Sequence, residues 1–183
     1  PTSFLTGGMD LFGFDKVNVE NDIAVLTSQH ILSQVVARLD LQTKVFSIGR
    51  VRENLMFNDP YIESIIFKKQ NKSQIWDVEI YNKKATISNK ESSFIINQGE
   101  VFENKDITLK INDSLFLEDQ TFSIRRSSLN NAVDNLRKNL TAAPASKQGE
   151  IVNLNFKGVN QSRNQAILNT IMQVLAEDQV NDK

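Results

Sequence analysis

The sequence contains no cysteine, a single histidine and no excess of either charge. Without cysteine, disulfide bridges and thiolate metal sites are excluded. Lysine and arginine number 21 against 22 aspartate and glutamate, which gives a net charge of -1, and the basic residues are spread along the chain. Nucleic-acid binding requires clustered positive charge, so we expect no nucleic-acid partner.

The sequence also has no long apolar run and no glycine-rich phosphate loop. None of the seven glycines falls in a spacing that would let backbone amides surround a phosphate. No run of about 18 apolar residues occurs, and no signal-peptide pattern is present, so no segment is predicted to cross a bilayer. The chain begins at Pro1 without an initiator methionine and stops at Lys183 within a helical pattern. We therefore expect a fragment of a longer protein.

Few residues could carry catalysis. His30 lies in a predicted helix, and a nucleophilic or metal site built around one histidine would lack its usual partners. Glu118 and Asp119 are adjacent acids in a polar turn, where solvated carboxylates are a simpler interpretation than a glycosidase pair. We predict no catalytic residue, no metal site and no cofactor.

The composition is that of a globular protein that can bury a sizeable core. Hydrophobic residues make up 40% and charged residues 23% of 183 residues, a size that usually forms one domain. Residues 1–17 are rich in glycine and phenylalanine without a period, and we interpret them as an N-terminal arm. Residues 18–183 are predicted to form the domain, because no stretch within them resembles a long linker.

The hydrophobic period changes along the domain. From residue 18 apolar residues recur at helical spacing, and Asn18 or Asn21 can cap this first helix. Between about residues 44 and 126 the period falls to two, which is typical of half-buried antiparallel strands separated by polar turns. The clearest alternating sets are Trp76, Val78 and Ile80, and Ile107, Leu109 and Ile111.

The last third of the domain alternates again between helix and strand. A strand through Phe122 and Ile124 is followed by a short helix over 132–140, a loop containing Pro144 and a strand through Val152, Leu154 and Phe156. A long helix then begins at Asn160 and is expected to extend in the parent protein. The fold class is therefore predicted as α+β: a mostly antiparallel central sheet covered by the N-terminal helix, the short helix and the long C-terminal helix.

Basic residues at two strand ends are candidates for binding a polysaccharide. Guanidinium and ammonium groups there could contact an acidic polysaccharide, although solvated strand ends explain them equally well. The candidates are Lys68, Lys69, Arg125 and Arg126.

Two segments resemble a known family. Residues 20–28 (ENDIAVLTS) with 35–41 (VVARLDL), and residues 149–156 (GEIVNLNF) with the helix start at Asn160, are similar to the bacterial chain-length determinant, or polysaccharide co-polymerase, family. Asn160 stands where the family has an Asp-Pro pair, and asparagine caps a helix about as well as aspartate. The resemblance covers roughly residues 18–183.

The resemblance implies a domain on the periplasmic face of the bacterial inner membrane, between two transmembrane helices outside this sequence. It implies assembly with further copies into a homo-oligomeric ring that controls the chain length or export of a capsule, exopolysaccharide or O-antigen. The implied partners are the polysaccharide or its polymerase and export machinery. Some members continue into a cytoplasmic tyrosine autokinase, although this fragment itself is not expected to be an enzyme. A periplasmic glycan-binding module is the alternative.

Overall fold

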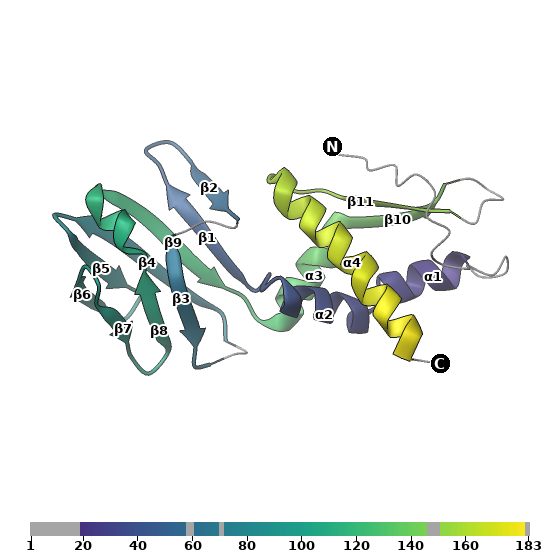
Figure 1. The fold of residues 1–183 in the computed structure, drawn as a ribbon, viewed down its shortest axis with the longest axis horizontal. Coiled ribbons are helices and arrows are strands. Elements are labelled where there is room, and N and C mark those ends of the chain that lie inside the picture. Colours follow the sequence, from purple (N-terminus) through teal and green to yellow (C-terminus); the bar gives the residue numbers. More distant parts are fainter. Residues whose placement is uncertain (1–18, 58–60, 70–71, 146–150, 182–183) are drawn as a thin grey trace. The chain divides into compact units, whose positions relative to one another are not determined.

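The structure, a computed structural model, describes residues 19–57, 61–69, 72–145 and 151–181 (Figure 1). The chain divides into two compact units. The helical unit combines Pro1–Leu41 with Leu129–Lys183, and the sheet unit is Gln42–Ser128. The sheet unit is thus inserted into the helical unit without a long linker at either junction. The predicted arm over residues 1–17 lies outside the described residues.

The larger sheet of the sheet unit has six strands, all paired antiparallel, in the order β2-β1-β9-β4-β5-β6. β9, which is late in the sequence, lies between the early strands β1 and β4. The strands are β1 (Thr43–Ile48), β2 (Glu53–Met56), β4 (Gln74–Tyr81), β5 (Lys84–Ser88), β6 (Ser93–Asn97) and β9 (Gln120–Arg126).

The second sheet has three antiparallel strands in the order β3-β8-β7. These are β3 (Ile62–Phe67), β7 (Val101–Glu103) and β8 (Ile107–Ile111), and a short 3-10 helix, η1 (Asp113–Leu117), precedes β9. One hydrophobic core draws its side chains from both sheets. We expected helices to cover the central sheet. Instead, the buried face of the six-stranded sheet packs against the second sheet, because the strands of both sheets place an apolar side chain at every second residue.

The strand faces follow the predicted alternation. Trp76, Val78 and Ile80 are at most 1% exposed, while the residues between them face solvent. Asn82 and Lys83 have positive φ angles of 50° and 60°, as a two-residue hairpin turn between β4 and β5 requires. This is one of the polar turns predicted between the strands.

The helical unit packs its helices around a two-stranded hairpin. α2 contacts both α3 and α4, while α1 contacts the hairpin strand β10 and α4 contacts β11 (Figure 1). The apolar side chains of these elements share one core. The elements are α1 (Val19–Leu26), α2 (Gln29–Arg38), α3 (Leu129–Asn139), β10 (Leu140–Pro144), β11 (Val152–Phe156) and α4 (Gln161–Asn181). The predicted α+β class, with its long C-terminal helix, is confirmed.

The first predicted helix is two helices. The Thr27 hydroxyl donates to the Ile23 carbonyl at 2.8 Å, and the Ser28 side chain accepts from the Ile31 amide at 3.3 Å. Ser28 is therefore the N-cap of α2, and its extended backbone ends α1. The apolar spacing continues across the break because both helices bury residues in the same core.

The segment around Pro144 is also different from its prediction. We expected a loop there, but β10 ends at Pro144 and pairs with β11 from Leu140↔Phe156 to Pro144↔Val152. Proline is tolerated at this end position of a two-stranded ribbon, where one side of each strand is free of ladder bonds. The predicted order of strand, helix and strand is present, but β11 pairs with β10 and is not a neighbour of β9.

Candidate functional site

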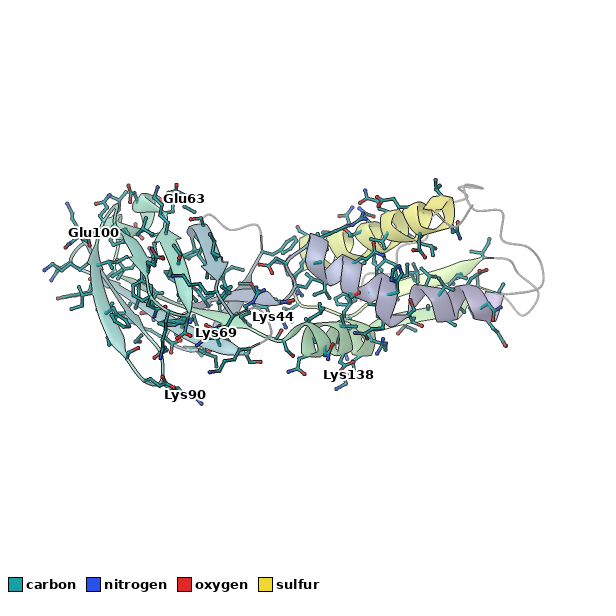
Figure 2. All side chains as sticks on the ribbon, turned by 90° about the horizontal axis from the view of Figure 1, so that it is seen from below. Lys44, Glu63, Lys69, Lys90, Glu100 and Lys138 are labelled. Atoms are coloured by element: carbon teal, nitrogen blue, oxygen red, sulfur yellow. The ribbon has the colours of Figure 1, made fainter. Side chains whose placement is uncertain are left out.

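Two of the candidate cations follow β3 directly. The Lys68 Nζ donates to Glu103 Oε1 at 2.7 Å and to the Asn104 carbonyl at 2.6 Å. The Lys69 Nζ donates to Asp106 Oδ1 at 2.6 Å. Figure 2 shows Lys69 at one end of β3 and Glu63 near the other. Both ammonium groups therefore hold the β7–β8 turn against the end of β3.

The other two candidates end β9 and point to opposite faces of the six-stranded sheet. The Arg126 guanidinium lies 4.5 Å from the centre of the Phe67 ring and donates to the Thr43 hydroxyl at 2.9 Å. Because Phe67 precedes Lys68, Arg126 joins Lys68 and Lys69 at one end of the sheet unit. Adjacent strand residues face opposite sides, which places Arg125 elsewhere.

Arg125 lies on the outer face of the sheet. Its guanidinium is 4.4 Å from the centre of the Phe46 ring, and it donates to Glu53 Oε1 at 2.6 Å and to the Ser123 hydroxyl at 3.3 Å. The structure thus brings three of the four predicted cations together and separates the fourth. Each of the four is engaged by side chains of its own unit.

Two further lysines belong to this cationic end, which we define as Lys68, Lys69, Lys72, Lys105 and Arg126. Lys72 and Lys105 are exposed and close enough to Asp106 to stabilise its charge. The sequence does not indicate that these two lysines lie close together, since they belong to separate turns that only the pairing of β3 with β8 brings together. Within the described residues neither lysine has a hydrogen bond or ion pair.

The acids at these contacts are held ionised. The hydrogen bond from Lys69, opposed by partial burial, lowers the pKa of Asp106 below its ordinary value, and Lys105 and Lys72 add to the electrostatic lowering. The hydrogen bond from Lys68 lowers the pKa of Glu103, and that from Arg125 lowers the pKa of Glu53. An acidic ligand at the cationic end would compete with Glu103 and Asp106 for the paired lysines.

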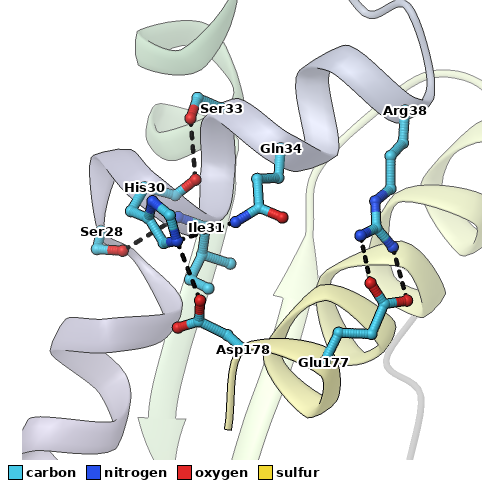
Figure 3. A network of polar contacts seen from close by, with 8 residues as sticks. All are labelled: Ser28, His30, Ile31, Ser33, Gln34, Arg38, Glu177 and Asp178. Carbon is cyan, nitrogen blue, oxygen red and sulfur yellow. Dashed lines mark hydrogen bonds and ion pairs between the residues drawn. The ribbon is translucent and has the colours of Figure 1, made fainter. Parts of the chain in front are cut away.

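His30 lies in a polar network between α2 and α4 (Figure 3). Its Nε2 is 3.0 Å from Asp178 Oδ1 and 2.9 Å from the Gln34 amide nitrogen. The Ser33 hydroxyl donates to the backbone carbonyl of His30 at 2.9 Å and not to its ring. A serine, histidine and aspartate relay needs the hydroxyl on the ring, so this network joins two helices and lacks triad geometry.

Beside this network, Arg38 of α2 forms a bidentate ion pair with Glu177 of α4 (Figure 3). The hydrogen bond from Arg38 lowers the pKa of Glu177. Among the residues that the structure describes, no group of three or more metal-ligating side chains occurs. In the same residues no helix is long and apolar enough to cross a membrane.

Comparison with known proteins gives one informative match. No protein-family model matches the chain. The chain is 22% identical over 196 residues to the tyrosine-protein kinase ptk of Acinetobacter johnsonii. The match covers 92% of this chain and 26% of that kinase, so the chain spans about a quarter of the relative's length. The chain is therefore similar to one segment of a larger protein named as a tyrosine kinase, which supports the predicted resemblance loosely.

Proposed function

We propose that this chain is the periplasmic domain of an inner-membrane polysaccharide co-polymerase. In this proposal it helps to control the chain length or export of a surface polysaccharide by assembling with further copies of itself. The observation that carries the proposal is the match of 92% of the chain to 26% of a tyrosine kinase. The residues that resemble chain-length determinants, 20–28, 35–41 and 149–156, lie within the same chain.

The internal contacts of both units support a structural role. The cations at the strand ends and the His30 network are each used to join elements of one unit. The six-stranded sheet is tied to a second sheet by a shared core. A packed scaffold of this kind can present fixed surfaces to neighbouring copies, and flanking membrane helices outside this sequence would hold those copies in one plane.

The proposal assigns chemistry to another part of the parent protein. The matched relative is named as a tyrosine kinase, and about three quarters of its length lies outside the match. We infer that the parent of this chain continues into a cytoplasmic tyrosine autokinase. Residues 1–183 then act without a cofactor of their own.

A deletion tests this division of roles. Removing residues 42–128 from the parent protein should alter the length distribution or surface amount of the polysaccharide while tyrosine autophosphorylation persists. The junction residues are adjacent, since the Ser127 amide donates to the Gln42 carbonyl at 2.9 Å, so a short turn can replace the deleted unit. Polysaccharide of unchanged length and amount would contradict the proposal.

A second candidate function, glycan binding, is favoured by the cationic end alone. Lys72 and Lys105 are exposed there, and the structure gives neither an ion pair among the described side chains. Calorimetry with a uronic-acid oligosaccharide would test it, with Lys72→Ala plus Lys105→Ala as the variant and Lys90→Ala as the control. Binding that the double variant loses and the control keeps would favour the glycan-binding module over the scaffold.

A further inference from the structure

Positively charged side chains gather in the helical unit where β11 leads into α4. The Lys157 amide donates to the Asn139 carbonyl at 2.9 Å, and the Asn164 side chain donates to the Gly158 carbonyl at 3.0 Å. These bonds hold the end of α3, the turn after β11 and the first turn of α4 together, and Figure 2 shows Lys138 projecting outward from α3. We define the cationic corner as Lys138, Lys157, Val159 and Arg163.

Among the residues that the structure describes, the charges of the cationic corner have no acidic partner. Lys138 and Lys157 are exposed and Arg163 is half-buried. Over the described ranges no acidic side chain pairs with any of the three, in contrast to the lysines at the end of β3. Burial lowers the pKa of Arg163, so its guanidinium has lost part of its hydration without gaining a carboxylate. The positive N-terminus of α4 adds to the attraction for an anion.

Side chains of the opposite charge lie at the start of α1. Glu20 and Asp22 lie in the first turn of this helix, and the structure shows no hydrogen bond or ion pair for either within its described part. Burial raises the pKa of Asp22, and no described group supplies a compensating positive charge. Val25 is 42% exposed and lies three residues after Asp22, on the same side of the helix.

The two charged surfaces lie at opposite ends of the helical unit. In Figure 1 α4 begins at one end of this unit, directly after β11, and α1 begins at the other. Each end combines unpaired charge with a protruding apolar side chain: Val159 at the corner is 90% exposed. Because the two surfaces face opposite ends of the unit, they can meet each other between two copies in line and not within one copy.

We propose that the acidic start of α1 in one copy docks on the cationic corner of a second copy. This contact is head-to-tail, so it leaves one free surface of each kind and can add further copies until a ring closes. The inference rests on the proposed scaffold function and names the contact through which the copies assemble. Val25 of one copy and Val159 of the other would contact each other beside the ion pairs, and both side chains would be buried from water.

A second copy fits these surfaces better than an acidic polymer does. A polymer would use the cationic corner and leave Glu20 and Asp22 unpaired, whereas a second copy pairs both ends. Exposed ion pairs contribute little individually, about 0–1 kcal/mol each. The contact should therefore be weak between free chains and strong between chains tethered in one plane, where the effective concentration is high.

Cysteine cross-linking tests the contact directly, because the natural chain contains no cysteine. The chain carrying Val25→Cys and Val159→Cys would be tethered by a terminal histidine tag to vesicles with nickel-chelating lipid and then oxidised. We expect a ladder of covalent multimers. The control pair, Val51→Cys with Val159→Cys, uses a residue that is 95% exposed in the sheet unit and should give no ladder. Equal products from both pairs would overturn the proposal.

Charge exchange gives a second test that does not depend on the stability of one variant. Adding Lys138→Glu and Lys157→Glu, or Glu20→Lys and Asp22→Lys, to the cysteine pair should each lower the multimer yield about tenfold. Mixing the two variants should restore the ladder, because every contact then joins opposite charges. A mixture no better than its components would contradict the head-to-tail contact.

The same variants separate this inference from the proposed function. If the parent protein assembles in detergent and its mass is unchanged by Lys138→Glu with Lys157→Glu, the contact is wrong and the scaffold stands. If the parent does not assemble at all, the scaffold function itself fails. If a uronic-acid oligosaccharide binds the tethered chain through Lys138 and Lys157 while no ladder forms, the corner serves a polymer and the inference is overturned.

Discussion

Phe122 shows how much a single side chain contributes to the sheet unit. Its ring is fully buried and lies 5.4 Å from the Tyr61 ring. Replacing it with alanine should lower the free energy of unfolding by about 3–5 kcal/mol, because a large cavity remains between the sheets. Trp76, the single tryptophan, is 1% exposed in the same core, so its fluorescence during urea unfolding reports the change.

The control for this substitution is Tyr81→Ala on the same sheet. Tyr81 is 61% exposed, and its loss should change the free energy of unfolding by no more than about 0.5 kcal/mol. Equal effects of the two substitutions would show that the sheets do not share the core described.

The lysine pairs at the end of β3 make the sheet unit sensitive to acid. The hydrogen bonds from Lys68 and Lys69 lower the pKa of Glu103 and of Asp106, so the folded state holds these protons less tightly than the unfolded chain. The stability they contribute is complete above the ordinary values of about 4 and is lost as the pH falls through the lowered folded values.

We therefore expect the urea midpoint, followed by Trp76 fluorescence, to fall between pH 7 and acid pH. Lys69→Gln should reduce the size of this fall, because its partner Asp106 then titrates closer to its ordinary pKa. A variant with the same pH dependence as the natural chain would show that the pair contributes nothing to folding.

Among the elements, α2 depends on its cap. Ser28 accepts a hydrogen bond from the Ile31 amide and separates α2 from α1. Ser28→Ala should lower the free energy of unfolding of the helical unit by about 1 kcal/mol, measured by circular dichroism at rising temperature. Ser33→Ala is a matched control, since its hydroxyl bonds to a carbonyl within α2 and caps nothing. A loss no larger than that of Ser33→Ala would contradict the cap.

The elements also show what the sequence could predict. The period of two placed Trp76, Val78 and Ile80 on one face because burial depends on local alternation. The break at Ser28 was missed because apolar spacing runs through it, although a serine before a helical stretch is a capping signal. Strand pairing was not predictable, since β9 joins strands far from it in sequence. For the same reason Lys72 and Lys105 were missed at the cationic end.

At the scale of the whole molecule, the two cores predict that two fragments of the chain differ in their ability to fold alone. Among the described residues, the core of the sheet unit draws only on Gln42–Ser128, and Thr43 pairs with Arg126 where the unit begins and ends. Residues 42–128 should therefore fold alone and keep the Trp76 emission of the full chain. Emission at the wavelength of the urea-unfolded chain would contradict this.

Residues 129–183 are the contrasting fragment. The core of the helical unit takes buried side chains from α1 and α2 as well as from α3 and α4. Without residues 19–41 that core lacks one side, so this fragment should show little cooperative unfolding by circular dichroism. A sharp transition would show that α3, the hairpin and α4 are self-sufficient.

The measurement that tests the account most directly is the mass of the assembled protein. Light scattering would compare residues 1–183 alone with the parent protein that includes its flanking membrane segments in detergent. The account predicts a closed assembly of many copies for the parent and weak or no association for the free chain. A parent protein that remains monomeric under these conditions would contradict the scaffold function.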